Sequence, residues 1–225
     1  MPTLEKLFLQ LEKCTAIESS IPYSKYTALD LSISNHELSK IDMSDAIAVE
    51  DFIANHLQKN NAQVAFGGYN EERNLYKSST IFNNEENEER NIHIGMDLWI
   101  KAGTPVLAAV DGEVYGFDFN TGKGNYGPTI ILKHTIESQI FYTLYGHLSV
   151  ESIEQIEIRT TFKKGQIVAT LGDSSVNGGY APHLHFQIIK NIEDYSGDYP
   201  GVCSKKDLDY YLDNCPDPNL LLKIK

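Results

Sequence analysis

The chain has 225 residues, with 19 Lys and Arg against 31 Asp and Glu, and a formal net charge of −12 at pH 7. So acidic a composition argues against nucleic-acid binding, which needs a basic surface, and against adsorption to anionic membranes. A hydrophobic content of 41% is enough for a folded core. No apolar run approaches the 18 residues of a membrane span. The length suits one sizeable domain, or a domain with a terminal extension.

Residues 1–65 are expected to form a helical or irregular N-terminal extension. Two apolar stripes have the spacing of amphipathic helices, and the second follows a helix-start signal at 42–45. The stripes are Leu4, Leu7, Phe8 and Leu11, and then Val49, Phe52, Ile53 and Leu57. This region lacks the strand pattern and every candidate metal ligand, so we expect it to be dispensable for metal binding.

The location of the protein is predicted from its first residues and its cysteines. Charged and polar residues between positions 5 and 13 interrupt any signal sequence, so we expect a cytoplasmic protein. If this is a processed chain, the alternative is a periplasmic or secreted one. Cys14, Cys203 and Cys215 are odd in number and have no Cys-x-x-Cys spacing, which favours three free thiols over a disulfide or a metal site.

From about residue 90 the pattern changes to short strands separated by turn residues. An acidic run at 83–89, expected to be a solvated loop, precedes them. Strands are predicted at 91–100, 105–110, 113–117, 129–134, 140–145, 166–171 and 183–189. Many short strands with little helix between them predict a mainly β domain, an antiparallel sandwich or barrel, over residues 66–225.

The strand predicted at 91–100 carries the first candidate site residues. Its side chains alternate, so that His93, Gly95 and Asp97 share one face. Because Gly95 has no side chain, a third group can sit between the imidazole and the carboxylate.

The strand predicted at 183–189 carries a second pair, His183 and His185, on one face, and His147 ends another strand. Imidazole nitrogens and a carboxylate oxygen are the ligands of a zinc site that leaves one position for water. Strand geometry alone does not decide which histidines would bind the metal. His134 has no partner motif and is expected to be structural.

Five segments together resemble peptidase family M23, the lysostaphin-like zinc metallopeptidases. They cover about residues 90–190 in the family's order: His-Ile-Gly-Met-Asp (93–97), Gly-Thr-Pro-Val-Leu-Ala-Ala-Val-Asp-Gly-Glu-Val (103–114), Leu-Tyr-Gly-His-Leu-Ser (144–149), Lys-Lys-Gly-Gln-Ile-Val-Ala-Thr-Leu-Gly (163–172) and Pro-His-Leu-His-Phe-Gln-Ile (182–188). The resemblance implies a compact antiparallel β-fold, the duplicated hybrid motif, with an open groove.

The same resemblance implies that His93, Asp97 and His185 bind Zn²⁺, and that His147 and His183 are the catalytic histidines. It implies an endopeptidase acting on peptides or on the cross-links of peptidoglycan. One alternative is an inactive zinc-binding interaction module, which loss of His147 or His183 would favour; both are present. A cupin-like metalloprotein also uses His-x-His, but it would need a glutamate about four residues later, and the first here is Glu193.

Two stretches depart from the family pattern or fall outside it. The loop before Pro182, at 174–180, is longer than the family's short turn. The glycine-rich segment 66–73 (Phe-Gly-Gly-Tyr-Asn-Glu-Glu-Arg) is favoured as a simple turn, with an edge of the groove as the alternative.

Overall fold

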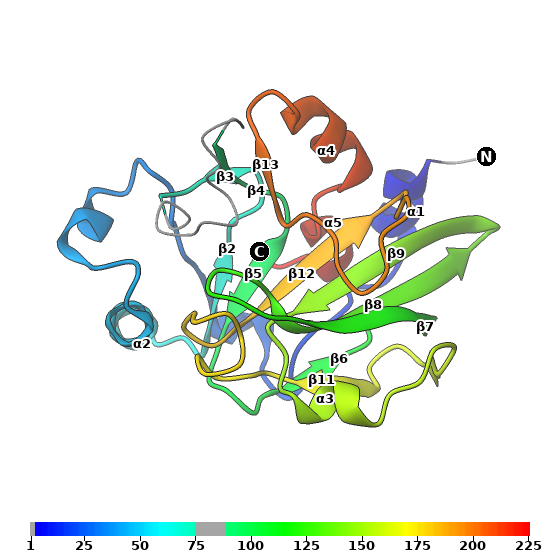
Figure 1. Cartoon of the computed structure of the whole chain (residues 1–225), viewed down its shortest axis with the longest axis horizontal. Helices are drawn as coiled ribbons and strands as arrows, with labels where there is room; N and C mark the ends of the chain where they lie inside the picture. The colour runs from blue at the N-terminus through cyan, green and yellow to red at the C-terminus, as the bar shows by residue number, and fades with distance from the viewer. Residues whose placement is uncertain (1–2, 75–88) are drawn as a thin grey trace.

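The computed structural model describes residues 3–74 and 89–225, and Figure 1 shows the arrangement of its helices and strands. One large sheet has eight strands in the order β1-β2-β5-β12-β9-β8-β7-β10. A three-stranded sheet, β13-β4-β3, and a two-stranded sheet, β11-β6, accompany it. Within the large sheet only β1 and β2 pair in parallel, and every other neighbouring pair is antiparallel. The described part of the chain is therefore the mainly β fold that the strand pattern predicts.

The N-terminal part contains helices and two short strands, and the rest is mostly strand. The helices are α1 Leu4–Gln10, η1 Tyr23–Lys25, η2 His36–Lys40, α2 Ala46–Lys59, α3 Glu151–Glu154, α4 Leu208–Asn214 and α5 Asn219–Leu222. The strands are β1 Tyr26–Ala28, β2 Val64–Gly67, β3 Glu71–Glu72, β4 Arg90–His93, β5 Met96–Trp99, β6 Pro105–Leu107, β7 Gly112–Asn120, β8 Gly127–Ile136, β9 Gln139–Gly146, β10 Thr161–Phe162, β11 Ile167–Thr170, β12 His183–Ile189 and β13 Val202–Ser204.

Both faces of the central strand β12 are buried, and its residues divide between them. Leu184, Phe186 and Ile188 join the main core, which also contains side chains from α1, α5 and the β11-β6 sheet. His183, His185 and Gln187 have the other parity and are also buried. On that second face a smaller apolar cluster joins the sheet to β4, β13 and the start of α4. The histidines therefore lie between two packed layers.

The N-terminal extension is built into this fold. The predicted amphipathic helices are present as α1 and α2, and the side chain of Asp45 caps α2 by accepting a hydrogen bond from the backbone of Ile47. However, the expectation of a helical or irregular region misses β1, which is only three residues long and has too few positions to show an alternation. Strand β2 crosses the expected boundary between residues 65 and 66 and pairs with β5.

The strand predicted at 91–100 is two strands in different sheets, which corrects the prediction of a single strand. The chain leaves β4 after His93 and enters β5 at Met96. The Ile94 backbone amide donates to Gly201 O at 3.0 Å, and Gly95 passes directly over the His185 ring. Ile94 consequently packs in the smaller apolar cluster and Met96 in the main core, so the apolar residues do not share one face.

Candidate metal centre and active site

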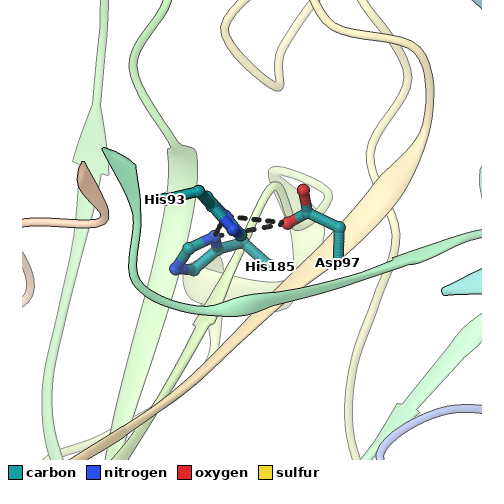
Figure 2. A group of neighbouring side chains, drawn as sticks. All are labelled: His93, Asp97 and His185. Atoms are coloured by element: carbon teal, nitrogen blue, oxygen red, sulfur yellow. Dashed lines mark hydrogen bonds and ion pairs between the residues drawn. The ribbon is translucent and has the colours of Figure 1, made fainter. Parts of the chain in front are cut away.

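His93, Asp97 and His185 converge on one point (Figure 2), although they come from three strands. His93 Nε2 and His185 Nδ1 are 2.8 Å apart, and each lies 3.3 Å from Asp97 Oδ1. The register of β12 on β5 places His185 directly opposite Asp97. All three side chains are at most 2% exposed. The two strands that replace the predicted single strand therefore still bring His93 and Asp97 together.

Hydrogen bonds on the far side of each imidazole fix its tautomer. His93 Nδ1 lies 2.9 Å from Gly68 O, and a carbonyl can only accept, so His93 carries its proton on Nδ1. His185 is reversed: its Nε2 donates to Gln187 Oε1 at 2.8 Å, while Gln187 Nε2 donates to Pro200 O. In the neutral forms the two facing nitrogens both present lone pairs. Two lone pairs at this distance repel each other unless both nitrogens bind the same cation.

Asp97 supplies an independent test of whether the site fits a metal. Among the described residues, Asp97 Oδ1 is a buried side-chain oxygen with no hydrogen-bond donor, and it faces the two imidazoles. Asp97 Oδ2 accepts from Arg73 Nη1 at 2.6 Å. Burial alone would raise the pKa of Asp97, but His93 and Arg73 hold it well below its ordinary value. The carboxylate is therefore ionised with one oxygen unsatisfied, which suits a divalent cation ligated by two nitrogens and one oxygen.

His147 and His183 lie beside the three converging residues with their rings 4.1 Å apart. His147 Nδ1 donates to Asn177 O and His183 Nδ1 to Ala181 O, each at 2.8 Å. The Trp99 ring stacks on His183 at 4.0 Å. Both imidazoles thus expose Nε2 as a proton acceptor. Burial lowers the pKa of His183 to about 4, and burial with the neighbouring imidazoles holds the pKa of His147 well below its ordinary value.

All five predicted site residues line one pocket of about 190 Å³. Its other walls come from Gly124–Tyr126, Tyr180, two arginines and the segment 198–202. His183 Nε2 is 3.9 Å from Asp97 Oδ1 and is not part of the converging group. The ligand and catalytic roles of these residues stay predictions, because geometry shows where they lie and not what they do.

Three further histidines lie outside the pocket. His134 is buried with both ring nitrogens hydrogen-bonded, to Asp111 O and to the Thr143 hydroxyl, which confirms a structural histidine. His56 bonds to Ala28 O from the rim of α2, and His36 is exposed. The three cysteines are buried free thiols, as expected. Of the acidic run at 83–89, only Glu89 lies within the described residues.

Three residues at the site were not singled out from the sequence. Arg73 belongs to the segment 66–73, for which the sequence favours a turn and gives no sign of an ion pair with Asp97. Gln187 is the next residue on the face of β12 that carries His183 and His185. This alternation could have identified Gln187 as a site residue from the sequence. Asn177 lies in the long loop 174–180; its backbone carbonyl holds His147, and its side chain bonds to the backbone of Tyr180. The segment 66–73 contains the predicted turn, at residues 69–70, and it also forms an edge of the site through Gly68 and Arg73.

Comparison with known proteins matches the region that carries these residues. The model of Peptidase family M23 covers residues 91–196. An uncharacterised metalloprotease of Haemophilus influenzae is 35% identical over 99 residues, which are 44% of this chain and 19% of that protein. The peptidoglycan DD-endopeptidase ShyC of Vibrio cholerae is 34% identical over 99 residues, 44% of this chain and 20% of that protein.

One solved structure in the comparison is the catalytic domain of lysostaphin from Staphylococcus simulans. It is 27% identical, covers 54% of this chain and 80% of its own, and has a TM-score of 0.38. The chain spans about a fifth of the length of the two curated relatives described above. Residues 91–196, which carry His93, Asp97, His147, His183 and His185, match the model of Peptidase family M23.

Proposed function

We propose that the protein is a zinc-dependent endopeptidase that hydrolyses peptide bonds, with the cross-linking peptides of peptidoglycan as its substrate class. The observation that carries the proposal is the unsatisfied Asp97 Oδ1 facing the lone pairs of His93 and His185, with two neutral imidazoles beside it. The names of the Vibrio cholerae and Haemophilus influenzae relatives support the reaction class, and the former supports the substrate.

His93, Asp97 and His185 would hold the zinc. The chemistry it supplies is Lewis-acid polarisation of the scissile carbonyl and a lowered pKa for water. Three protein ligands leave the open position that a catalytic site requires.

The remaining chemistry falls to His147 and His183, whose Nε2 atoms face the pocket and can take a proton from the attacking water and return it to the leaving amine. Once protonated, the same Nε2 atom can donate a hydrogen bond to the oxyanion. Backbone carbonyls fix both rings from the far side, so neither has to reorient before the proton moves. Stacking on Trp99 and burial keep bulk water from His183.

The experiment is to load the full chain with zinc and incubate it with purified peptidoglycan and, separately, with glycine-rich peptides. New amino termini in either substrate, abolished by chelation and restored by zinc, are the expected result. Elemental analysis of the same preparation should show near-stoichiometric metal that falls sharply in Asp97→Ala.

Two outcomes would contradict the proposal in different ways. Stoichiometric zinc without new amino termini in either substrate would favour the inactive zinc-binding module. If the protein binds no zinc, the proposal that His93, Asp97 and His185 form a zinc site is wrong.

No helix within residues 3–74 and 89–225 combines the length and apolar character needed to cross a membrane.

A further inference from the structure

We infer that the segment 68–73, which lies outside the family match, is part of the metal centre, and that Arg73 is a positioning residue for the ligand Asp97. The inference rests on the proposed metal site. Arg73 is 1% exposed. Its guanidinium donates from Nη1 to Asp97 Oδ2 at 2.6 Å and from Nε to Glu71 Oε2 at 2.5 Å. A planar fork between two carboxylates fixes the orientation of both.

The consequence for the metal follows from which oxygen Arg73 occupies. With Oδ2 held by the guanidinium, only Oδ1 faces the imidazoles. Asp97 is thereby restricted to binding through one oxygen. Without Arg73 the carboxylate could rotate and offer both oxygens, which would use the coordination position that a catalytic metal keeps open.

Gly68, in the same segment, orients a second proposed ligand, His93. Its carbonyl accepts the proton of His93 Nδ1 at 2.9 Å, which directs His93 Nε2 toward Asp97. Gly68 has φ +100°, and a Cβ there would overlap Arg73 Nη2 and lie 3.0 Å from His93 Nδ1. Only glycine therefore lets the backbone approach the imidazole while the guanidinium passes beside it. One six-residue segment orients two of the three ligands.

The segment is itself held by the N-terminal extension. Glu71 Oε1 accepts from the backbone amide of Leu31 at 3.2 Å, and Ile33 N donates to Glu72 O at 2.9 Å. Leu29 N donates to Phe66 O, also at 2.9 Å. A chain of contacts thus runs from residues 29–33 through Glu71 and Arg73 to Asp97. This runs against the expectation that residues 1–65 are dispensable for metal binding.

The test must separate positioning from charge, because removing Arg73 alone would also remove a cation that repels the metal. The double variant Glu71→Gln with Arg73→Met keeps the net charge of the pair and deletes the donor to Asp97 Oδ2. We expect its zinc dissociation constant, measured by chelator competition on the full chain, to rise about 10–100-fold. Arg90→Met controls for the loss of an arginine that does not contact Asp97: Arg90 lines the same pocket but bonds to Val202 O, and zinc affinity should not fall by more than about threefold.

A second measurement reports ligand geometry without relying on activity. With Co²⁺ in place of zinc, the visible absorption of the double variant should weaken, because a two-oxygen carboxylate raises the coordination number. Arg73→Lys keeps the charge but cannot span both carboxylates, so it should retain the fold, lose affinity about 2–10-fold and show the same spectral change.

The possible results distinguish failure of the proposed metal site from failure of the inference about Arg73. If the unmodified protein binds neither zinc nor Co²⁺, the proposed function fails. If it binds both and the double variant matches it in affinity and spectrum, Arg73 only compensates the buried charge of Asp97, and the inference is overturned. Should the double variant not fold, an Arg73→Lys protein identical to the unmodified one in both readouts would overturn it equally.

Discussion

Backbone carbonyls hold three pocket histidines in the same tautomer. His93, His147 and His183 each donate from Nδ1, to Gly68, Asn177 and Ala181 respectively, and each therefore presents Nε2. His185 is reversed through Gln187. Side chains with fixed tautomers need no rearrangement when a ligand or proton arrives, which favours both metal binding and proton transfer.

A matched pair of variants separates the two histidines of β12. His183→Ala should keep most of the bound zinc and lose turnover by about 10²-fold or more, because its Nε2 is placed for proton transfer and lies outside the converging group. His185→Ala should lose both metal and turnover. Elemental analysis and the release of amino termini check this. If His183→Ala strips the metal as completely as His185→Ala, the site has four protein ligands.

A methyl group at Gly95 should displace a ligand. Its Cβ would lie 2.5 Å from His185 Nε2 and 3.1 Å from Phe186 O, so Gly95→Ala should lose most of the bound metal. Gly103→Ala is the control: its Cβ meets nothing, but φ +78° strains alanine, at a cost of about 1 kcal/mol in the free energy of unfolding. Metal content and urea unfolding distinguish them. Full metal in Gly95→Ala would mean that the ring can shift and still bind.

Secondary-structure elements from outside the family match complete the core. Helix α1 packs beside α5 and contributes Leu4 and Phe8 to the main core, where the Phe8 ring lies edge-on to Phe141 of β9 at 4.9 Å. Strand β2 adds Val64 to the same core and pairs with β5, which carries Asp97. The extension therefore supports the sheet on which the site is built.

Truncation of Phe8 measures this support. Phe8 is fully buried, so Phe8→Ala should cost about 3–5 kcal/mol in the free energy of unfolding through lost burial and the cavity that remains. Leu9, its neighbour on the same helix, is 62% exposed, and Leu9→Ala should change stability by no more than about 0.5 kcal/mol. Denaturant midpoints of the two variants give the comparison. Equal midpoints would show that α1 docks too weakly to stabilise the domain.

At the scale of the whole molecule, buried neutral histidines make stability depend on pH. Burial lowers the pKa of His134 to about 4, below its ordinary value of 6.5. Between those values the unfolded chain binds more protons than the folded one. The contribution of neutral His134 to the free energy of unfolding is therefore complete above pH 6.5. It is lost progressively as pH falls toward 4, at up to about 1.4 kcal/mol per pH unit.

Replacing His134 should flatten this dependence. Between pH 7 and pH 5, in the presence of a chelator, His134→Gln should lose about 1–2 kcal/mol less stability than the unmodified protein. His36→Gln, at an exposed position, should follow the unmodified protein. Urea unfolding at the two pH values gives the result. Parallel losses in all three proteins would mean that His134 is not neutral in the folded state.

The sequence by itself determined most of the strands and helices around the pocket and the chemical types of the side chains that line it. Alternation in β12 assigns His183 and His185 to one face and Leu184 and Phe186 to the other, because strand side chains have a period of two. The apolar stripes of α1 and α2 are likewise local, since they repeat with the helical period. The five pocket residues could be picked out without a structure, because four of them lie two or four residues apart in alternating strand patterns and His147 ends another predicted strand.

Only the tertiary structure decided how those elements meet. The break between β4 and β5 is set by the contact of Ile94 with Gly201 and of Gly95 with the His185 ring, whose partners lie 107 and 90 residues further along the chain. The ion pair from Arg73 to Asp97 depends on the pairing of β2 with β5. The position of the Glu71 carboxylate depends on its hydrogen bond from the Leu31 backbone amide. Such contacts leave no periodic trace in a sequence, because each joins segments whose local patterns are independent. The buried charges find their partners only when the layers close around the pocket.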